Sequence, residues 1–318
     1  SRWYQDRLYR NDGKGNFQPD PAALPAMRSS TACVSGADYD GDGDTDLFVG
    51  GRIDPGNYAA LPESFLLENR GGRFVDVTSQ RAPALRFAGR VSAAQWTDLN
   101  DDGRPDLLLA GEWMPLTCFF NSGADFQREA IPHSTGWWNS LAAADLDGDG
   151  DTDFVAGNLG RNHPFRSGTD SLPRLHVNDF DKDGRREALI TSFLQGVEAP
   201  VHYRDDLLGW LYGLKKEFPD YRSYAEASWE TLFPPAVRTH SEVVTAEQLA
   251  SVWIERTPDG FTLHPLPVEA QFAPIYSVVV DDYDGNGHAD LLLAGNSFAT
   301  ETNTGRYDAL LGLLLRGD

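Results

Sequence analysis

The stretch of sequence that decides the fold runs from residue 37 to residue 51 and reads ADYDGDGDTDLFVGG. Acidic residues alternate along it, Gly43 stands at a turn, and an apolar run follows at once. The candidate side-chain ligands are Asp38, Asp40, Asp42 and Asp46. Ca²⁺ takes six to eight oxygen ligands, whereas carboxylates held this closely without a cation repel one another. The stretch therefore predicts a calcium-binding loop.

This loop begins like an EF-hand and ends differently. Ligands at positions 1, 3 and 5, a glycine at position 6 and a backbone carbonyl at position 7, here that of Asp44, are shared with the EF-hand. An EF-hand also needs a bidentate Glu at position 12 and flanking helices, but position 12 here is Val49 in a β-rich run. The last ligand comes at position 9, Asp46. We therefore expect the loop to join two strands, so that the metal fixes a β-hairpin.

The same pattern occurs five times, which is the mark of a repeat architecture. We number the copies loop 1 (residues 38–46), loop 2 (98–106), loop 3 (145–153), loop 4 (179–187) and loop 5 (282–290). Position 6 is glycine in each: Gly43, Gly103, Gly150, Gly184 and Gly287. The further candidate ligands, with position 7 acting through its carbonyl, are Asp98, Asn100, Asp102, Arg104 and Asp106; Asp145, Asp147, Asp149, Asp151 and Asp153; Asp179, Asp181, Asp183, Arg185 and Glu187; Asp282, Asp284, Asn286, His288 and Asp290. Solvated acidic turns do not repeat the same offsets five times, so we expect about five Ca²⁺ sites.

Charge and cysteine content narrow the class of protein. The chain has 48 acidic and 27 basic residues in 318, a formal net charge of −21. Nucleic acid and anionic membranes need a basic face, and no apolar run reaches membrane length, so we expect neither as a partner. A salt-adapted source would explain the acidity equally well. Cys33 and Cys118 lie in apolar runs, and their spacing indicates buried free thiols rather than a disulfide framework.

The strand pattern predicts an all-β protein. Residues 31–80 and 91–131 each read as four strands with turns between them, and further strands are expected in residues 139–160, 174–203, 250–266 and 276–315. Four-stranded units at a period near fifty residues indicate a β-propeller. Residues 205–233 show apolar residues three and four apart, which predicts two helices broken at Pro219 and inserted between strands. We expect a single domain over residues 1–318.

Six stretches resemble a known family: YQDRLYRNDGKGNF, DYDGDGDTDLFVGGR, LLLAGEWMP, GWWNSLAAADLDGDGDTD, VAGNLGRN and EAQFAPIYSVVVDDYDGNGHADLLLAGN. They are similar to FG-GAP/VCBS repeats, the calcium-binding propeller repeats of integrin α-subunits. The similarity is closer still to bacterial VCBS proteins related to the cartilage acidic protein and its UnbV/ASPIC relatives. The resemblance implies a propeller of seven blades, or alternatively six, that is cut at both ends or closed by pairing of its termini.

The resemblance also implies a function and a location. It implies an extracellular calcium-stabilised scaffold that binds or adheres to protein or glycan ligands. We expect the protein to be secreted, periplasmic or exposed at the cell surface, because calcium sites of this kind suit millimolar extracellular calcium. We also expect a monomer.

Ligand recognition is expected on loops that follow the second strand of each blade, at the face away from the metal. The residues expected to converge there are Trp113, Arg161, Asn162, His163, Arg306 and Tyr307. Aromatic, amide and guanidinium groups suit sugars or peptide carboxylates, although turn capping or packing between blades would explain each residue singly. The alternative function is a propeller enzyme such as a calcium-dependent polysaccharide lyase, with His163 or Tyr307 as base beside Arg161. We expect a binding protein and assign no catalytic residue.

Overall fold

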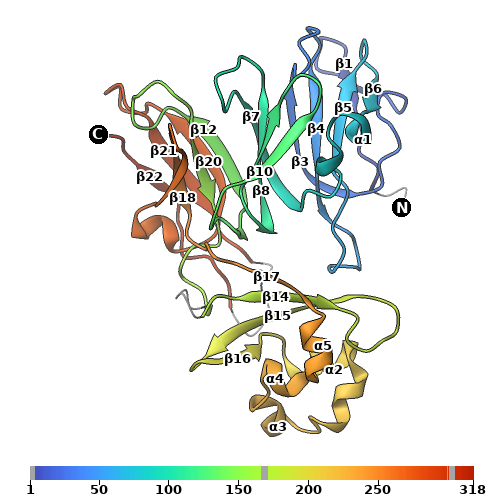
Figure 1. Cartoon of the computed structure of the whole chain (residues 1–318). Helices are drawn as coiled ribbons and strands as arrows, with labels where there is room; N and C mark the ends of the chain where they lie inside the picture. The colour runs from blue at the N-terminus through green and yellow to red at the C-terminus, as the bar shows by residue number, and fades with distance from the viewer. Residues whose placement is uncertain (1–3, 166–170, 299, 301–304) are drawn as a thin grey trace. The chain divides into compact units, whose positions relative to one another are not determined.

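A computed structural model describes residues 4–165, 171–298, 300 and 305–318 of the chain (Figure 1). The described residues divide into two compact units. The first unit comprises Ser1–Asp54, Leu61–Asn162 and Gln248–Asp318, and the second comprises Pro55–Ala60 and His163–Glu247. The fold is mostly β and contains several four-stranded antiparallel sheets, as the sequence predicts.

The first unit is a series of antiparallel sheets, which we name by the loops they carry. A short hairpin comes first, formed by β1 (Tyr9–Asn11) and β2 (Phe17–Pro19). The loop-1 sheet contains β3 (Ser30–Ala37), β4 (Asp46–Ile53), β5 (Phe65–Asn69) and β6 (Phe74–Asp76). The loop-2 sheet contains β7 (Arg90–Thr97), β8 (Asp106–Met114), β9 (Thr117–Asn121), β10 (Phe126–Ala130) and β11 (Gly136–Trp137). Between these two sheets the chain forms α1 (Thr78–Arg81) and the 3₁₀ turn η2 (Pro83–Leu85).

Two further sheets complete the first unit. The loop-3 sheet contains β12 (Ser140–Ala144), β13 (Asp153–Gly157), β18 (Val252–Thr257) and β19 (Gly260–Pro265). The loop-5 sheet contains β20 (Ile275–Asp281), β21 (Asp290–Gly295) and β22 (Leu313–Leu315), and η4 (Val268–Gln271) precedes it. Because β13 pairs directly with β18, the segment from residue 163 to residue 247 is inserted between the second and third strands of the loop-3 sheet.

Successive sheets of the first unit pack face to face through the strand that follows each metal loop. Side chains alternate across a strand, and the residue two positions after the ninth loop residue faces the next sheet. Phe48 packs with residues of the loop-2 sheet, Leu108 packs with the loop-3 sheet, and Val155 packs with the loop-5 sheet. Each side chain is at most 1% exposed. The apolar runs after loops 1, 2 and 3 therefore build the cores on both faces of their sheets.

The second unit has its own sheet and helices. Its strands are β14 (Arg174–Asn178), β15 (Glu187–Leu194), β16 (Val197–Pro200) and β17 (Glu242–Thr245), in the order β16-β15-β14-β17. Its helices are α2 (Arg204–Trp210), η3 (Tyr212–Lys216), α3 (Tyr221–Ala225), α4 (Trp229–Leu232) and α5 (Pro235–Thr239). They share one hydrophobic core with the sheet, and its buried members include Phe180, Leu189, Leu207, Leu208 and Trp229.

The helical segment is more divided than the apolar spacing predicts. A break at Pro219 is present, but Leu211 leaves the helical conformation with φ −106° and ψ 70° and separates α2 from η3. Ser228 begins α4 with a capping box in which its side chain accepts the N–H of Thr231. Pro235 then stands in the first turn of α5, where proline fits because that N–H has no partner inside a helix. These local start signals outweigh the longer apolar period.

The two cysteines are free thiols, as predicted. Cys118 is buried and Cys33 is partly buried. Burial raises the pKa of Cys33 to about 11 and that of Cys118 to about 12. Both side chains are therefore neutral packing groups at physiological pH.

Candidate metal centre

Each of the five loops closes a β-hairpin in the same register. The residue before position 1 pairs with the residue at position 9 in every copy: Ala37 with Asp46, Thr97 with Asp106, Ala144 with Asp153, Asn178 with Glu187, and Asp281 with Asp290. The expectation that the loops join strands rather than helices is confirmed. Figure 1 shows these hairpins as the turns between β3 and β4, β7 and β8, β12 and β13, β14 and β15, and β20 and β21.

The carboxylate at position 1 accepts the backbone N–H of the glycine at position 6 in all five loops. The N···O distances are 3.0 Å for Gly43 to Asp38, 2.7 Å for Gly103 to Asp98, 3.1 Å for Gly150 to Asp145, 3.0 Å for Gly184 to Asp179 and 2.9 Å for Gly287 to Asp282. The φ angles of these glycines lie between +81° and +96°, a region that side chains with a Cβ disfavour. Position 6 is therefore glycine for a conformational reason.

Position 5 folds back in the same way in every copy. Its side-chain oxygen accepts the N–H of position 7, at 2.8 Å from Asp44 to Asp42, 2.9 Å from Arg104 to Asp102, 3.0 Å from Asp151 to Asp149, 2.8 Å from Arg185 to Asp183 and 2.8 Å from His288 to Asn286. These bonds hold the acidic side chains toward the inside of the turn. The side-chain oxygens at positions 1 and 5 therefore fix the backbone of the turn by accepting its N–H groups.

Position 4 is a requirement that the sequence analysis missed. Its φ is positive in all five loops: +77° at Gly41, +61° at Asp101, +80° at Gly148, +64° at Lys182 and +76° at Gly285. Three copies meet the requirement with glycine. Asp101 and Lys182 adopt the left-handed conformation at an energetic cost of about 1–2 kcal/mol. The recurrent DGDG and DGNG motifs in the sequence indicate this requirement, because they place glycine at position 4 as well as at position 6.

Position 9 has a structural role besides any contact with metal. Asp46, Asp106, Asp153 and Asp290 are at most 1% exposed. One carboxylate oxygen of each accepts the N–H of loop position 2, at 3.3 Å from Tyr39, 3.0 Å from Leu99, 3.2 Å from Leu146 and 2.9 Å from Tyr283. The other accepts an N–H from the third strand or just beyond it, at 2.7 Å from Asn69, 2.6 Å from Asn121, 2.8 Å from Arg256 and 2.8 Å from Gly317. The ninth residue thus ties the hairpin to the strand beside it.

The electrostatics at position 9 favour a nearby cation. Burial raises the pKa of Asp46 to about 6. Burial is also the main cause that raises the pKa values of Asp106, Asp153 and Glu187. Position 1 behaves differently: burial opposes the shift at Asp98, yet N–H donors led by that of Gly103 lower its pKa. A bound cation would stabilise the charged form of the buried ninth carboxylate.

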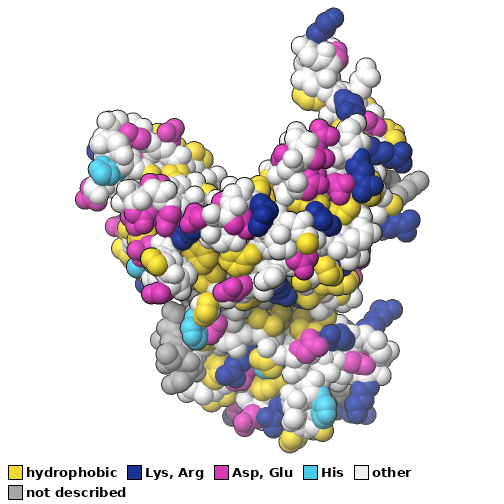
Figure 2. All heavy atoms as spheres, turned by 45° about the horizontal axis from the view of Figure 1, so that its top comes forward, with side chains coloured by type: hydrophobic (Ala, Val, Ile, Leu, Met, Phe, Trp, Pro, Cys, Tyr) yellow, Lys and Arg dark blue, Asp and Glu magenta, His cyan; other side chains and the backbone are white. Residues whose placement is uncertain are grey.

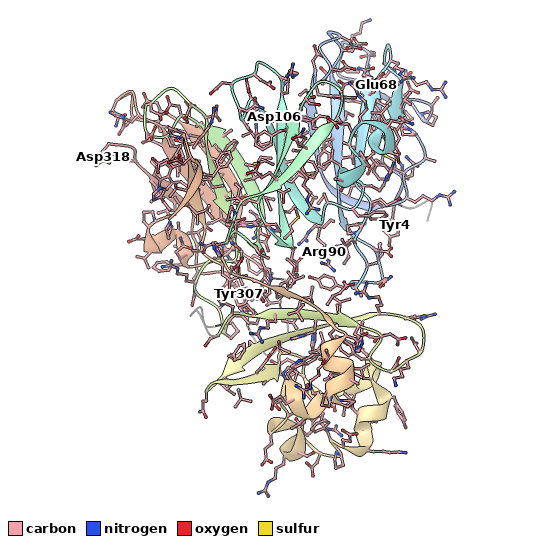
Figure 3. The ribbon with its side chains drawn as sticks, viewed as in Figure 1. Tyr4, Glu68, Arg90, Asp106, Tyr307 and Asp318 are labelled. Carbon is pink, nitrogen blue, oxygen red and sulfur yellow. The ribbon has the colours of Figure 1, made fainter. Side chains whose placement is uncertain are left out.

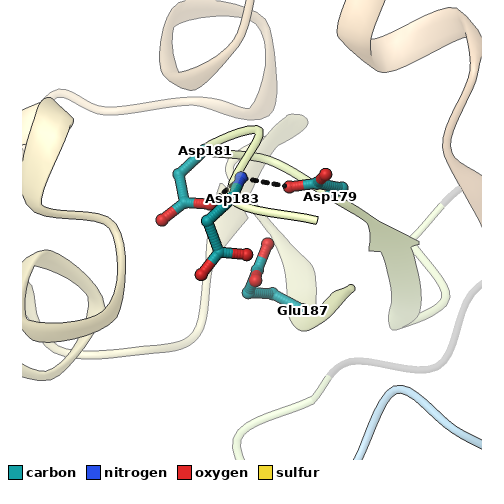
Figure 4. Close-up of side chains that lie close together, drawn as sticks. All are labelled: Asp179, Asp181, Asp183 and Glu187. Atoms are coloured by element: carbon teal, nitrogen blue, oxygen red, sulfur yellow. Dashed lines mark hydrogen bonds between the residues drawn. The ribbon is translucent and has the colours of Figure 1, made fainter. Parts of the chain in front are cut away.

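Four of the loops bring acidic oxygens within 4.8 Å of one another. These groups are Asp38, Asp40 and Asp42; Asp145, Asp147 and Asp153; Asp179, Asp181, Asp183 and Glu187; and Asp282, Asp284 and Asp290. Figure 4 shows the group from loop 4, in which the N–H of Asp183 donates to Asp179 at 3.0 Å. Hard oxygen donors at this spacing fit a metal ion such as Ca²⁺. In loop 2, position 3 is the amide Asn100, whose oxygen accepts the N–H of Asp102 at 3.0 Å.

The metal loops share one end of the sheets in the first unit. Figure 3 marks Asp106 at this end of the loop-2 sheet. In the space-filling view, Asp and Glu side chains gather there in magenta (Figure 2). The loops of the first unit therefore contribute to an acidic surface at this end of the sheets.

The six residues expected to bind a ligand have different surroundings. Trp113 is 4% exposed and its ring lies 4.8 Å from that of Trp137. The N–H groups of Arg161 and Asn162 both donate to the carbonyl of Gln271, at 2.8 and 3.2 Å, so these two residues lie together. The Asn162 amide also donates to the carbonyl of Phe272 at 3.1 Å.

The other three expected residues have contacts of their own. The guanidinium of Arg306 lies 5.5 Å from the centre of the Phe298 ring, and Tyr307 pairs with Ser297 through two backbone bonds of 2.8 and 3.0 Å. Figure 3 marks Tyr307. His163 belongs to the second unit, where its ring lies 5.5 Å from that of Phe165. Convergence of all six residues on one ligand stays a prediction.

The fold and the loops define a class of β-sheet repeat protein with acidic hairpins that could hold metal. Comparison with protein families gives the repeat: the model of the FG-GAP-like repeat matches residues 2–49 and 98–156. The matched segments include loop 1, loop 2 and loop 3. The chain therefore contains FG-GAP-like repeats, as the sequence analysis predicts.

Comparison with solved structures finds the crystal structure of the V. cholerae biofilm matrix protein Bap1. The sequences are 11% identical, the match covers 92% of this chain, and the TM-score is 0.31. The matched region spans 62% of the Bap1 chain. No curated protein matches the sequence. Within the described residues, none of the helices is long and apolar enough to cross a membrane.

Proposed function

We propose that this chain is an extracellular, calcium-stabilised β-propeller that serves as a binding or adhesion scaffold for protein or glycan ligands. The observation that carries the proposal is the fivefold repetition of one loop geometry. In each copy, positions 1, 5 and 9 accept backbone N–H groups and gather their oxygens inside a hairpin turn. Five Ca²⁺ ions would be held by the side chains at positions 1, 3, 5 and 9 and the carbonyl at position 7.

Calcium would contribute stability that these short turns lack by themselves. The loops concentrate carboxylates in a chain that already has a net charge of −21, and mutual repulsion opposes their close approach. A divalent cation removes that repulsion, and the ninth residue transmits the restraint to the third strand. Calcium sites of low affinity are filled at extracellular concentrations, which supports a secreted, periplasmic or cell-surface location.

The packing of sheets in the first unit supports a propeller. Leu292 stands two residues after the ninth position of loop 5, the place that Phe48, Leu108 and Val155 occupy in the other sheets. Those three side chains are buried against the next sheet, whereas Leu292 is 43% exposed. It lies in register with Val279 and Leu314, which are 49% and 43% exposed. This open apolar face suits a further sheet, and a ring of seven blades, or six, would place one there.

The ligand face of the propeller would lie at the other end of the sheets. Strands β4, β8, β13 and β21 begin at their metal loops and end at the opposite edge. Trp113 lies near the end of β8, and the loops that follow β13 and β21 contain Arg161, Asn162, Arg306 and Tyr307. Loops held on a rigid scaffold carry recognition disproportionately, and exposed guanidinium groups such as that of Arg161 pair well with carboxylates of glycans or peptides. These residues are the proposed contacts.

The proposal is tested by calcium binding and by ligand binding in parallel. Native mass spectrometry should count five Ca²⁺ ions per chain, and excess EDTA should lower the melting temperature sharply. Each site that is lost removes about 2.7 kcal/mol when calcium stands at one hundred times Kd, and EDTA preloaded with calcium is the control. An unchanged melting temperature would falsify the structural role of calcium.

The scaffold role has its own readout. Calcium-loaded protein should bind members of a panel of immobilised glycans and extracellular proteins, and Arg161→Ala should weaken that binding while leaving the melting temperature unchanged. Retained calcium sites with full binding by Arg161→Ala would place the ligand on another surface. Failure to bind any member of the panel would contradict the scaffold role and leave the calcium role standing.

A further inference from the structure

One residue near the end of each third strand bonds to the metal loop of its own sheet. These residues are Asn69, Asn121, Arg256 and Gly317, and each donates its backbone N–H to the ninth loop residue. The bond depends on the backbone alone, so the side chain at this place is free to make other contacts. What those side chains contact differs from sheet to sheet.

Asn121 extends from the loop-2 sheet to loop 1. Its side-chain amide donates to the carbonyl of Tyr39, position 2 of loop 1, at 2.7 Å, and to the carbonyl of Pro105 in loop 2 at 3.2 Å. Asn121 is 2% exposed, so these bonds are shielded from water and costly to lose. Tyr39 therefore bonds to two residues: its carbonyl accepts the amide of Asn121, and its N–H donates to Asp46. Asn121 thus connects the buried ends of two loops.

Arg256 makes the corresponding connection from the loop-3 sheet to loop 2. Its backbone N–H donates to Asp153 at 2.8 Å, while its guanidinium forms a bidentate pair with Asp101 at 2.6 and 3.2 Å. Asp101 is position 4 of loop 2 and has φ +61°. The Arg256 side chain is only 12% exposed, and two parallel bonds fix its orientation. It therefore holds in place a residue whose backbone conformation is unfavourable for a side chain.

The other two sheets provide internal comparisons. The side-chain amide of Asn69 donates to Thr45 of its own loop at 3.0 Å, and its oxygen accepts the N–H of Gly72 at 2.7 Å. Gly317 has no side chain, and its carbonyl accepts the amide of Asn286 within loop 5 at 3.0 Å. These contacts remain within one sheet and its own loop.

We propose that Asn121 and Arg256 are positioning residues that couple calcium binding at neighbouring loops, loop 1 with loop 2 and loop 2 with loop 3. This proposal rests on the calcium sites proposed above. Loop 5 would bind calcium independently of the coupled set.

The coupling arises from shared ordering. Calcium in loop 3 fixes Asp153 and therefore the backbone of Arg256, whose guanidinium then holds Asp101 in the conformation that loop 2 needs. A site that is already ordered binds its ligand with a smaller loss of entropy. Linkage requires the same factor in both directions, so calcium in loop 2 must strengthen binding in loop 3 equally.

Electrostatics alone predicts the opposite sign. A Ca²⁺ ion in loop 3 repels one in loop 2, and the positive charge of Arg256 repels both. On that basis, removing the Ca²⁺ ion of loop 3 or the charge of Arg256 would tighten calcium binding in loop 2. Positioning by Arg256 predicts instead that either removal weakens calcium binding in loop 2. This difference in sign makes the proposal testable.

The experiment is a calcium titration of the full chain followed by hydrogen–deuterium exchange of peptides that cover each loop. Asp145→Asn combined with Asp147→Asn disables loop 3, and Arg256→Gln removes the guanidinium but keeps the backbone N–H. Arg316→Gln is the matched control. Arg316 lies 3.8 Å from Asp284 of loop 5, so this substitution removes the same charge beside a loop outside the coupled set.

Disabling loop 3 should raise the calcium midpoint of loop 2 about fivefold or more and leave that of loop 5 unchanged. Arg256→Gln should raise the loop 2 midpoint by a similar factor, and disabling loop 3 in that background should add nothing. Arg316→Gln should leave loops 2 and 3 unaffected. A loop 2 midpoint that stays constant or falls in Arg256→Gln overturns the coupling and leaves calcium binding intact. If calcium protects none of the loops from exchange, the proposed function itself is overturned.

Discussion

The backbone N–H of Asn121 lies 2.6 Å from Oδ1 of Asp106, and this bond joins the third strand of the loop-2 sheet to the last residue of its metal loop. The second oxygen of Asp106 accepts the N–H of Leu99 at 3.0 Å. Asp106 is fully buried. The carboxylate therefore satisfies two backbone donors that have no access to water.

Asp106→Leu is expected to destabilise the protein even in the presence of a chelator. Leaving two buried N–H groups without acceptors should cost about 2–4 kcal/mol. Urea unfolding in EDTA measures this free energy. Asp102→Asn is the matched control, because its remaining side-chain oxygen still accepts the N–H of Arg104. It should weaken calcium binding and change the free energy of unfolding in EDTA by less than about 1 kcal/mol. Equal losses for the two variants would show that position 9 acts through the metal alone.

Asn100→Asp is expected to tighten calcium binding at loop 2 about tenfold, since it adds one charge close to the ion. Asn286→Asp adds the same charge at loop 5 but removes the 3.0 Å bond from the Asn286 amide to the carbonyl of Gly317. Its gain should therefore be smaller. Calcium titrations followed by exchange at each loop separate the two effects. Equal tightening in both variants would mean that the bond to Gly317 contributes nothing to loop 5.

Lys182→Gly is expected to stabilise the second unit by about 0.5–1 kcal/mol. Lys182 has φ +64° at position 4 of loop 4, where three of the other copies have glycine. Relief of that conformation outweighs the added freedom of the unfolded chain. Lys182→Ala keeps a Cβ at the strained position and should bring no stabilisation. Urea unfolding of both variants in EDTA provides the comparison. Stabilisation by Ala as large as that by Gly would point to the lysine charge instead.

The second unit should lose stability as the pH falls from about 6.5 toward 4. Burial lowers the pKa of His202 to about 4, and its Nε2 accepts the N–H of Ile190 at 3.1 Å. The unfolded chain binds a proton at His202 below about pH 6.5, while the folded chain does so only near pH 4. This contribution is thus fully present above pH 6.5 and is lost as the pH falls, by up to about 3 kcal/mol.

His202→Gln tests this source of pH dependence because its side-chain oxygen can accept the same N–H without titrating. Hydrogen exchange of peptides from residues 187–210 should show a flatter pH profile than in the wild type. His240→Gln, at an exposed histidine, should retain the wild-type profile. Superimposable profiles for wild type and His202→Gln would rule out His202 as the cause.

The sequence by itself determined the repeats and the local form of each loop. Ligand spacing, glycine at position 6 and an apolar run after Asp46 or Asp106 are local properties, because a tight turn and a buried strand each restrict residues a few positions apart. These features correctly predicted hairpins, strands and antiparallel sheets. Apolar residues three and four apart predicted a helical segment at 205–233 with a break at Pro219, and the structure divides this segment further at Leu211 and Ser228.

Only the tertiary structure showed what position 9 does and which residues contact it. Asn121 and Arg256 lie 15 and 103 positions from their carboxylates, Asp106 and Asp153, and no local pattern marks a backbone donor at such distances. The pairing of β13 with β18 across the inserted second unit is likewise a long-range choice. It is decided by burial of apolar faces, which depends on the whole fold. Local sequence placed the acidic oxygens in their turns, and packing between distant strands determined how the loops are held and joined.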